Sequence, residues 1–294
     1  MTNRHVVLNS GRTVGISGAG DPLARRLVIL CHPTPGAGAF DPDPTTTNSW
    51  GVRLLTVDRP GYGSSEPIRA DGAATVENRA DDLAEYVRRS EHNADRLSHP
   101  EFRGIGVVGW GLGGSVALSL AARHPDLIDR VAVVGTRLPV RAMPSTASPS
   151  QPMPLRVQAR LTVADVMADL SHRGAMGLDW LGIAADDPAL AGPGVRNRLE
   201  RMLADASVQG VAGVATDLVA AEDVAWSREL GQIRASTILV YGESDPMVKR
   251  TDGRWFRRHV PNSKLVVVKN AGRLAIVSTW EQILEHVAPR TEHA

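Results

Sequence analysis

The stretch of this sequence most suggestive of chemistry joins a short apolar strand to a helix through a glycine corner. Residues 105–108 are mostly β-branched, which predicts a strand buried on both faces. The small residues of 115–124 predict a helix close against a sheet. A sharp corner between such elements can expose a nucleophilic side chain at the edge of a sheet. The central residue of this corner is Gly111, between Gly109 and Gly113, so it has no side chain that could react.

Three other predicted strands lead into charged or imidazole side chains. His32 follows the apolar run 27–31, Asp245 follows 237–241, and Arg273 lies in the turn after 264–268. Imidazole and carboxylate groups transfer protons as general acids or bases, whereas arginine keeps its charge near neutral pH. These three side chains are therefore noted for the chemistry that their types allow.

Two further residues could supply a nucleophile. Ser115 lies one turn into the predicted helix, where we expect its side chain to pack toward the sheet. Cys31 ends a predicted strand, and a lone buried cysteine is more often part of the core than reactive. We expect neither to react.

Predicted strands alternate with predicted helices along most of the chain, which favours a mostly parallel sheet covered on both faces. The first two strands, separated by Asn9-Ser10-Gly11, form a predicted hairpin. The predicted strands are His5–Leu8, Arg12–Ser17, Leu27–Cys31, Val52–Val57, Phe102–Gly109, Arg130–Val134, Thr237–Tyr241 and Lys264–Val268. Helices are predicted at Thr75–Arg89, after the corner, near Asp252–His259 and around Trp280–Val287.

The middle of the chain has a different pattern. Residues 141–154 contain four prolines among serines, and after them the sequence favours helices only. The predicted helices are Leu155–Leu170, His172–Ile183, Val195–Ala206 and Val208–Ala221. This pattern predicts a core of residues 1–136 and 232–294 and an all-helical cap of residues 137–231. The alternative is that these helices only thicken the domain.

Composition excludes several classes of function. The 294 residues are 43% hydrophobic and 22% charged with a net charge of +1, which is typical of a globular protein and argues against a nucleic-acid surface. The single cysteine excludes an internal disulfide and a C-x-x-C metal site. No apolar stretch approaches the roughly 20 residues of a membrane span. Arginine greatly outnumbers lysine, which we attribute to GC-rich coding. We expect a cytoplasmic bacterial protein, a monomer or homodimer, without metal, cofactor, nucleic-acid partner or membrane partner.

Five motifs in this order resemble those of the α/β-hydrolase superfamily. They are His32-Pro33-Thr34-Pro35-Gly36, Asp58-Arg59-Pro60-Gly61-Tyr62-Gly63 with Ser65, the corner around Gly111, Gly242-Glu243-Ser244-Asp245, and Gly272-Arg273-Leu274. The resemblance implies an α/β-hydrolase fold, with a mostly parallel eight-stranded sheet flanked by helices and a helical cap insertion.

The family's mechanism uses a serine nucleophile, a histidine base and a carboxylate that orients the histidine. The resemblance assigns these positions to Gly111, Arg273 and Asp245, so only the acid is kept. Glycine relieves the strained backbone of the family's corner, which costs about 1–3 kcal/mol for a residue with a side chain. We expect Arg273 and Asp245 to form an ion pair.

The resemblance also implies ligand contacts. The main-chain N–H groups of Leu112 and Thr34 stand where the family stabilises a carbonyl oxygen, although Pro33 replaces the family's glycine beside them. Trp110 and Arg273 are further candidate contacts. In the family, the histidine at position 32 usually braces loops. Cap residues that could touch a ligand are His172, Asp179, Trp180, Asp217 and Trp226, of which the two tryptophans are also expected as cap core.

Three functions remain open from the sequence. The first is a small-molecule binding or accessory protein that keeps the capped pocket, takes a carbonyl or carboxylate ligand, and has lost the covalent chemistry. The second is a lyase, isomerase or cyclase acting without a covalent intermediate, with Asp245 or His32 as base. The third is an esterase-like or epoxide-type hydrolase with an unconventional nucleophile or an activated water.

Overall fold

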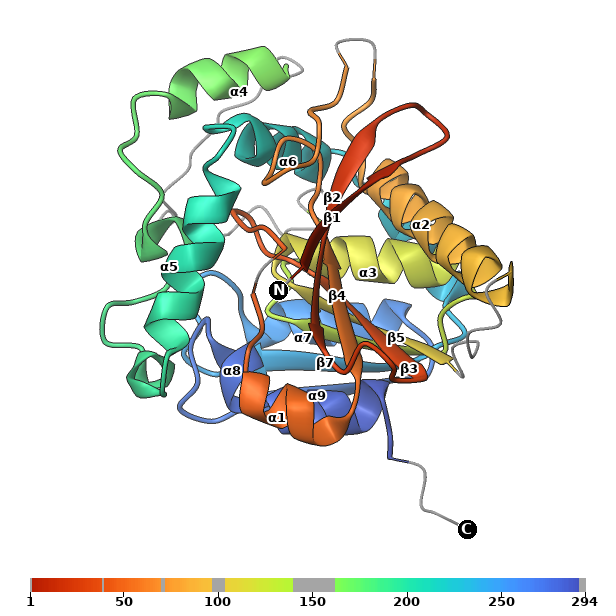
Figure 1. The fold of residues 1–294 in the computed structure, drawn as a ribbon. Coiled ribbons are helices and arrows are strands. Elements are labelled where there is room, and N and C mark those ends of the chain that lie inside the picture. Colours follow the sequence, from red (N-terminus) through yellow and green to blue (C-terminus); the bar gives the residue numbers. More distant parts are fainter. Residues whose placement is uncertain (1, 39, 70–71, 97–103, 140–161, 291–294) are drawn as a thin grey trace.

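The computed structural model describes residues 2–38, 40–69, 72–96, 104–139 and 162–290, which fold around one twisted sheet (Figure 1). Its eight strands lie in the order β1-β2-β4-β3-β5-β6-β7-β8. The strands are β1 (Thr2–Val7), β2 (Thr13–Gly20), β3 (Arg26–Cys31), β4 (Arg53–Val57), β5 (Gly104–Trp110), β6 (Arg130–Val134), β7 (Ser236–Gly242) and β8 (Ser263–Val268). The predicted eight-stranded fold is confirmed.

The pairing of the strands brings the loops with polar residues to one edge. The pairs of β1 with β2 and of β2 with β4 are antiparallel, and every other pair is parallel. Cys31 of β3 pairs with Gly109 of β5, which pairs with Val133 of β6. The segments that follow these strands therefore begin side by side at their carboxyl ends.

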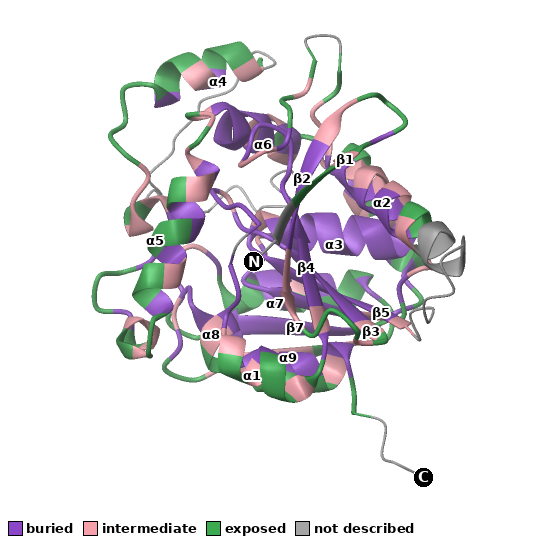
Figure 2. Ribbon diagram, in the orientation of Figure 1, coloured by how far each residue is buried: buried purple, intermediate pink, exposed green. Residues whose placement is uncertain are grey.

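Helices cover both faces of the sheet. Residues of α2, α3 and α7 pack into one hydrophobic cluster, and residues of α8 and α9 pack into another, with Trp50 of α1 against it. The bounds are α1 (Pro44–Trp50), α2 (Val76–Arg96), α3 (Leu112–Arg123), α7 (Arg250–His259), α8 (Ala275–Ser278) and α9 (Trp280–Val287). Ten of the twelve residues of α3 are buried, so the helix after the corner lies inside the core (Figure 2).

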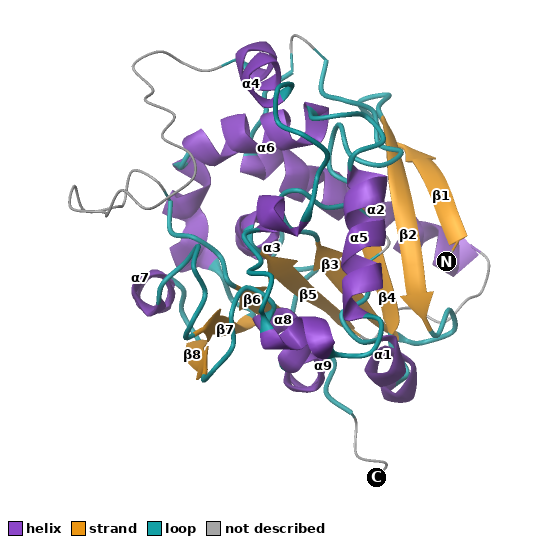
Figure 3. Ribbon diagram, turned by 90° about the vertical axis from the view of Figure 1, so that its left-hand side faces the viewer, coloured by secondary structure: helices purple, strands orange, loops and turns teal. Residues whose placement is uncertain are grey.

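The described residues between β6 and β7 form helices and no strand. They are α4 (Val163–Leu170), η2 (Leu178–Leu181), η3 (Pro188–Ala191), α5 (Val195–Ala206), α6 (Ala212–Glu222) and η4 (Ala225–Gln232), of which the η elements are 3₁₀ helices. Figure 3 shows α5 and α6 on the side of the sheet where the loops after β3 and β5 begin, with α4 beyond α6. Trp226 and Leu230 of η4 join the core cluster of α3, so the bounds of the cap stay a prediction.

Two local predictions differ from the structure. The predicted helix His172–Ile183 is reduced to η2, because Gly174 and Gly177 precede it and Gly182, in the left-handed conformation, ends it. Helix α1 was not predicted; Asp43 caps its N-terminus and Pro44 begins its first turn. The proline-containing segment 141–154 lies outside the described residues, and so does part of the helix predicted over 155–170.

In the described part of the chain, no helix has both the length and the apolar character needed to cross a membrane. Within those same residues, no group of three or more His, Cys, Asp or Glu side chains is placed to hold a metal ion.

Candidate active site

Gly111 forms the corner between β5 and α3 in a conformation that favours glycine. Its φ is 61° and its ψ is −124°. The N–H of Gly111 donates to the carbonyl of Val134 (2.9 Å), and its own carbonyl accepts from the hydroxyl of Thr136 (2.7 Å). The expected strained corner is therefore present, held by hydrogen bonds on both sides, and glycine adopts it at little cost.

The guanidinium of Arg273 fills the space next to this corner. A Cβ atom placed at Gly111 would lie 2.7 Å from Nη2 of Arg273. Arg273 is buried, and it donates from Nε to the carbonyl of Leu181 (3.1 Å) and from Nη1 to the carbonyl of Gly135 (2.8 Å). The arginine is thus fixed from both the sheet and the cap, where the side chain of a nucleophile would need room.

Asp245 forms the expected ion pair with Arg273, with 3.6 Å between Oδ2 and Nη1. Its other carboxylate oxygen accepts from the N–H groups of Met247 (2.8 Å) and Val248 (3.3 Å). Asp245 is 2% exposed and does not line the cavity described below. The suggestion that it acts as a base on a ligand is wrong in this geometry, because its carboxylate is turned to the protein.

The prediction that His32 could act as an acid or base also requires correction. The backbone N–H of Arg59 donates to its Nε2 (3.1 Å), which leaves Nδ1 to donate to the carbonyl of Pro33 (2.9 Å). Burial, together with the nearby charge of Arg59, lowers the pKa of His32 well below its usual value. Both ring nitrogens are occupied by backbone groups, so His32 braces two loops.

A cavity of about 380 Å³ opens beside the corner, between the ends of the strands and the cap. This volume is within the range of small-molecule sites. Its lining from outside residues 162–232 includes Thr34, Pro35, Gly111, Leu112, Ser115, Gly135, Arg137, Leu138, Met247, Val248 and Arg273. Its lining from residues 162–232 comprises Leu170, Arg173, Asp179, Trp180, Val214, Asp217, Leu218, Ala221, Glu222 and Trp226.

The two other candidate nucleophiles, Ser115 and Cys31, lie in different surroundings. Ser115 lines the cavity, contrary to the prediction that it packs toward the sheet, because it lies in the first turn of α3, next to the corner. Cys31 is part of the core cluster, and burial raises the pKa of its thiol to about 12. No histidine is among the described residues that line the cavity, so Ser115 has no imidazole beside it there.

Three hydrogen-bond donors without a protein acceptor in the described part of the chain belong to residues that line this cavity. They are the N–H of Leu112, the N–H of Thr34 and Nη2 of Arg273, and none donates to an acceptor among the described residues. Leu112 begins α3, so its N–H is one of the unpaired donors of a helix N-terminus. A carbonyl or carboxylate oxygen is the complement of such a set.

Of the other residues predicted to contact a ligand, some line the cavity and some do not. Trp110 does not line the cavity; it is fully buried and packs against Phe40, with 5.5 Å between ring centroids. Along β5 it points to the same face as Val108, toward α8 and α9, whereas α3 covers the other face. Asp179, Trp180, Asp217 and Trp226 line the cavity, and His172 is exposed elsewhere.

A buried ion cluster, which the sequence did not predict, joins the cap to the core. Asp217 of α6 is fully buried and pairs with Arg59 (2.6 Å) and Arg79 (3.1 Å). It also accepts hydrogen bonds from the hydroxyls of Thr34 (2.5 Å) and Tyr62 (2.9 Å). Burial alone would raise the pKa of Asp217, but the charges of Arg59 and Arg79 outweigh burial and lower the pKa to about 2.

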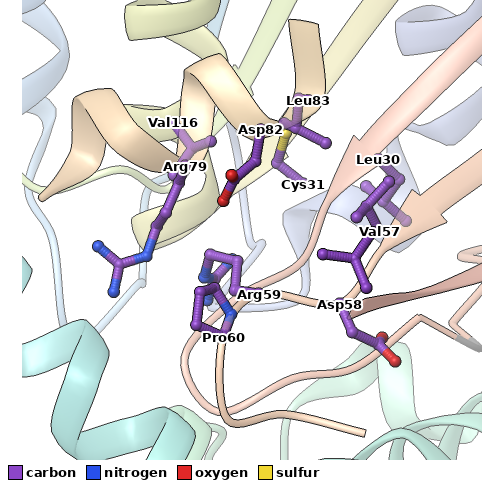
Figure 4. Close-up of a pocket in the computed structure, with 11 residues that line it drawn as sticks. Leu30, Cys31, Val57, Asp58, Arg59, Pro60, Arg79, Asp82, Leu83 and Val116 are labelled. Atoms are coloured by element: carbon purple, nitrogen blue, oxygen red, sulfur yellow. The ribbon is translucent and has the colours of Figure 1, made fainter. Parts of the chain in front are cut away.

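A much smaller cavity of about 20 Å³ lies on the core side of these arginines. Figure 4 shows Arg79, Asp82 and Leu83 from α2 near Arg59 and Pro60 from the loop after β4. Such a volume holds about one water molecule and no organic ligand. This small cavity is therefore not a candidate ligand site.

Comparisons with known proteins agree with this architecture. The sequence profile described as "alpha/beta hydrolase fold" matches residues 26–278. A relative from Aromatoleum aromaticum, named pimeloyl-[acyl-carrier protein] methyl ester esterase, is 28% identical over 78% of this chain and 83% of its own length. Another from Cupriavidus pinatubonensis, named 2-hydroxy-6-oxononadienedioate/2-hydroxy-6-oxononatrienedioate hydrolase, is 24% identical over 95% of this chain and 91% of its own length.

Solved structures share the fold at lower identity. The enol-lactonase from Burkholderia xenovorans LB400 has a TM-score of 0.69 and 19% identity, covering 96% of this chain and all of that one. A hydrolase from Pseudomonas aeruginosa has a TM-score of 0.67 and 20% identity, covering 97% of each chain. At these identities the likeness concerns the fold.

Proposed function

We propose that this chain, which belongs to the α/β-hydrolase family, binds a small carbonyl or carboxylate compound in its capped cavity without hydrolysing it through an acyl-enzyme. One observation carries the proposal: the guanidinium of Arg273 lies 2.7 Å from where a side chain at Gly111 would begin. The cation at the base position thus also occupies the space beside the nucleophile position, on a residue that lines the cavity.

The loss of hydrolysis follows from the roles that the reaction needs. A serine mechanism requires a hydroxyl, a base that takes its proton, and a group that orients the base. Glycine supplies no hydroxyl, and arginine is not deprotonated near neutral pH. The relatives above are named as hydrolases, so the proposal separates this chain from them in activity.

The chemistry of the ligand follows from the donors. Two backbone N–H groups can hold one oxygen, and the cation of Arg273 favours an oxygen that carries negative charge. The names of the two relatives describe a methyl ester of an acyl chain and a dioate with an oxo group, and these support an acyl compound with a carboxyl or carbonyl end. An aliphatic monoester of a dicarboxylic acid contains both groups and is a suitable probe.

The two other functions lose support at particular residues. A lyase or isomerase would need a base. Asp245 and His32 are engaged by the protein, and the carboxylate of Asp217 is neutralised by two arginines. The exposed carboxylates of Asp179 and Glu222 also line the cavity, so they are the bases that such a reaction would have to use. A hydrolase with another nucleophile could use Ser115, which lines the cavity. That possibility is an outcome of the tests below.

Replacing Arg273 with glutamine is expected to weaken the binding of monomethyl pimelate at least about tenfold, because a charge-assisted hydrogen bond to the ligand is lost. The matched control is Arg198→Gln in α5. Arg198 also donates to two backbone carbonyls, of Pro193 and Pro42, but it does not line the cavity. Isothermal titration of both variants measures the difference. Equal affinities for the two variants would contradict the role of Arg273.

A further inference from the structure

We propose that Asp217 is a positioning residue that makes the Thr34 donor of the cavity depend on the cap being in place. Asp217 belongs to α6, between β6 and β7, whereas Thr34 belongs to the loop after β3, and the two side chains share a 2.5 Å hydrogen bond. The inference rests on the proposed function for its ligand, although its first test requires no ligand.

The carboxylate of Asp217 collects donors from three core segments. Thr34 donates from its hydroxyl, Arg59 from Nε and Nη2, Tyr62 from its hydroxyl, and Arg79 lies 3.1 Å away through Nη2. All of these contacts are to one fully buried side chain of α6. In the described structure, one carboxylate of α6 thus joins the loop after β3, the loop after β4 and α2, and Arg79 adds a contact from Nη2 to the backbone carbonyl of Thr216 in α6 (2.9 Å).

Arg59 extends this control along the loop itself. It donates from Nη1 to the carbonyl of His32 (2.5 Å) and from Nη2 to the carbonyl of Pro33 (2.9 Å). Nη2 also lies 3.0 Å from the hydroxyl of Thr34. Residues 32–34, which we call the donor loop, are therefore held on three successive residues by a guanidinium that Asp217 orients.

Displacement of α6 would remove the only carboxylate that pairs with Arg59 among the described residues. Arg59 and Arg79, which are buried beneath α6 in this structure, would then lose the carboxylate that they share and would repel each other as like charges. The guanidinium of Arg59 would no longer be oriented toward the donor loop by Asp217. Cap displacement and release of the Thr34 donor are therefore one event.

This arrangement couples the ligand to the cap. A ligand oxygen bound by the N–H of Thr34 favours the ordered donor loop, and the ordered loop favours the closed position of α6. By linkage, the factor by which cap closure strengthens ligand binding is the factor by which the ligand strengthens cap closure. Asp217 and the hydroxyl of Thr34 carry this coupling without themselves reacting.

The test uses Thr34→Val, which removes the hydroxyl link and leaves both arginine contacts of Asp217. Thr34→Ser is the rescue variant. Thr216→Val is the matched control, because the hydroxyl of the neighbouring Thr216 donates within α6 to the carbonyl of Ala212 and does not line the cavity. Amide hydrogen exchange is followed in α6 and in residues 31–38, a segment that contains the donor loop and more amide protons than the loop itself has, because Pro33 has none. Exchange in residues 31–38 is called donor-loop exchange, and it is measured first without ligand and then with monomethyl pimelate.

Without ligand, we expect exchange in the donor loop of Thr34→Val to be about tenfold faster than in the wild type and in the two other variants. With the probe, α6 exchange is expected to slow in the wild type and in Thr34→Ser but not in Thr34→Val. The probe is also expected to bind Thr34→Val about tenfold more weakly.

Two results separate failure of this inference from failure of the proposed function. If donor-loop exchange is the same in Thr34→Val and in the wild type, or if the probe slows α6 exchange equally in both, Asp217 does not position Thr34. If the wild type fails to bind the probe while ligand-free exchange differs as expected, the positioning role stands and the proposed ligand class is wrong.

Discussion

Replacing Asp217 with asparagine is expected to lower the free energy of unfolding by about 3–5 kcal/mol, because it leaves two buried guanidinium groups without their carboxylate. Arg59 and Arg79 are 5% and 2% exposed, so water cannot screen them in the folded state. Urea unfolding measures the loss. The control is Asp126→Asn, which breaks a surface pair with Arg88 whose side chains are about half exposed. That change should cost about 0–1 kcal/mol.

The pH dependence of the same variant has a definite sign. The pKa of Asp217 is lowered to about 2, below the ordinary value of a free aspartate. A depressed pKa stabilises the fold at pH values above the ordinary pKa, and this stabilisation of about 2 kcal/mol is lost as the pH falls from about 4 to about 2. The stability difference between the wild type and Asp217→Asn should shrink over this window. A constant difference would contradict the charge argument.

Combining Gly111→Ser with Arg273→His is expected to create esterase activity at least about a hundredfold above either single variant, because a nucleophile and its base fail alike when separated. The other groups that the reaction needs are present. Leu112 and Thr34, whose N–H groups have no acceptor among the described residues, line the cavity, and Asp245 already lies 3.6 Å from the guanidinium that an imidazole would replace. Hydrolysis of activated short-chain esters and labelling by a fluorophosphonate at position 111 are the measurements.

The single variants should also differ in stability. In Gly111→Ser the new Cβ would lie 2.7 Å from Nη2 of Arg273 and would take up a strained backbone conformation, which costs about 1–3 kcal/mol before the arginine is displaced. The double variant removes this contact and should be more stable than Gly111→Ser. A folded double variant that neither hydrolyses esters nor takes the label would show that the cavity has changed beyond these two positions. Labelling of Ser115 by the fluorophosphonate in the wild type would show that the protein has a nucleophile at a position other than 111.

Most of the fold follows from local sequence. Runs such as residues 27–31 and 131–134 are apolar on both faces, and such runs predict strands of a covered parallel sheet. The failures are local as well. Helix α1 depends on the cap at Asp43 rather than on periodicity, and the region of η2 is interrupted by glycines that outweigh its apolar residues.

The candidate site was predicted where motifs carry it and missed where distant segments meet. Gly111, Arg273 and Asp245 were identified from their motifs, and their proximity is confirmed. Trp110 was misassigned because one step along a strand reverses the face of a side chain. The pair of Arg59 and Asp217 spans 158 residues, and no local pattern indicates which arginine a cap carboxylate will meet.

The most direct test of the account follows monomethyl pimelate with a ¹³C-labelled ester methyl group by NMR in the presence of the wild-type protein. We predict that the methyl ester signal broadens or shifts as the compound binds beside Arg273, and that no methanol signal grows beyond that of a protein-free sample. Release of methanol faster than in that sample would contradict the claim that this site binds its ligand without hydrolysing it.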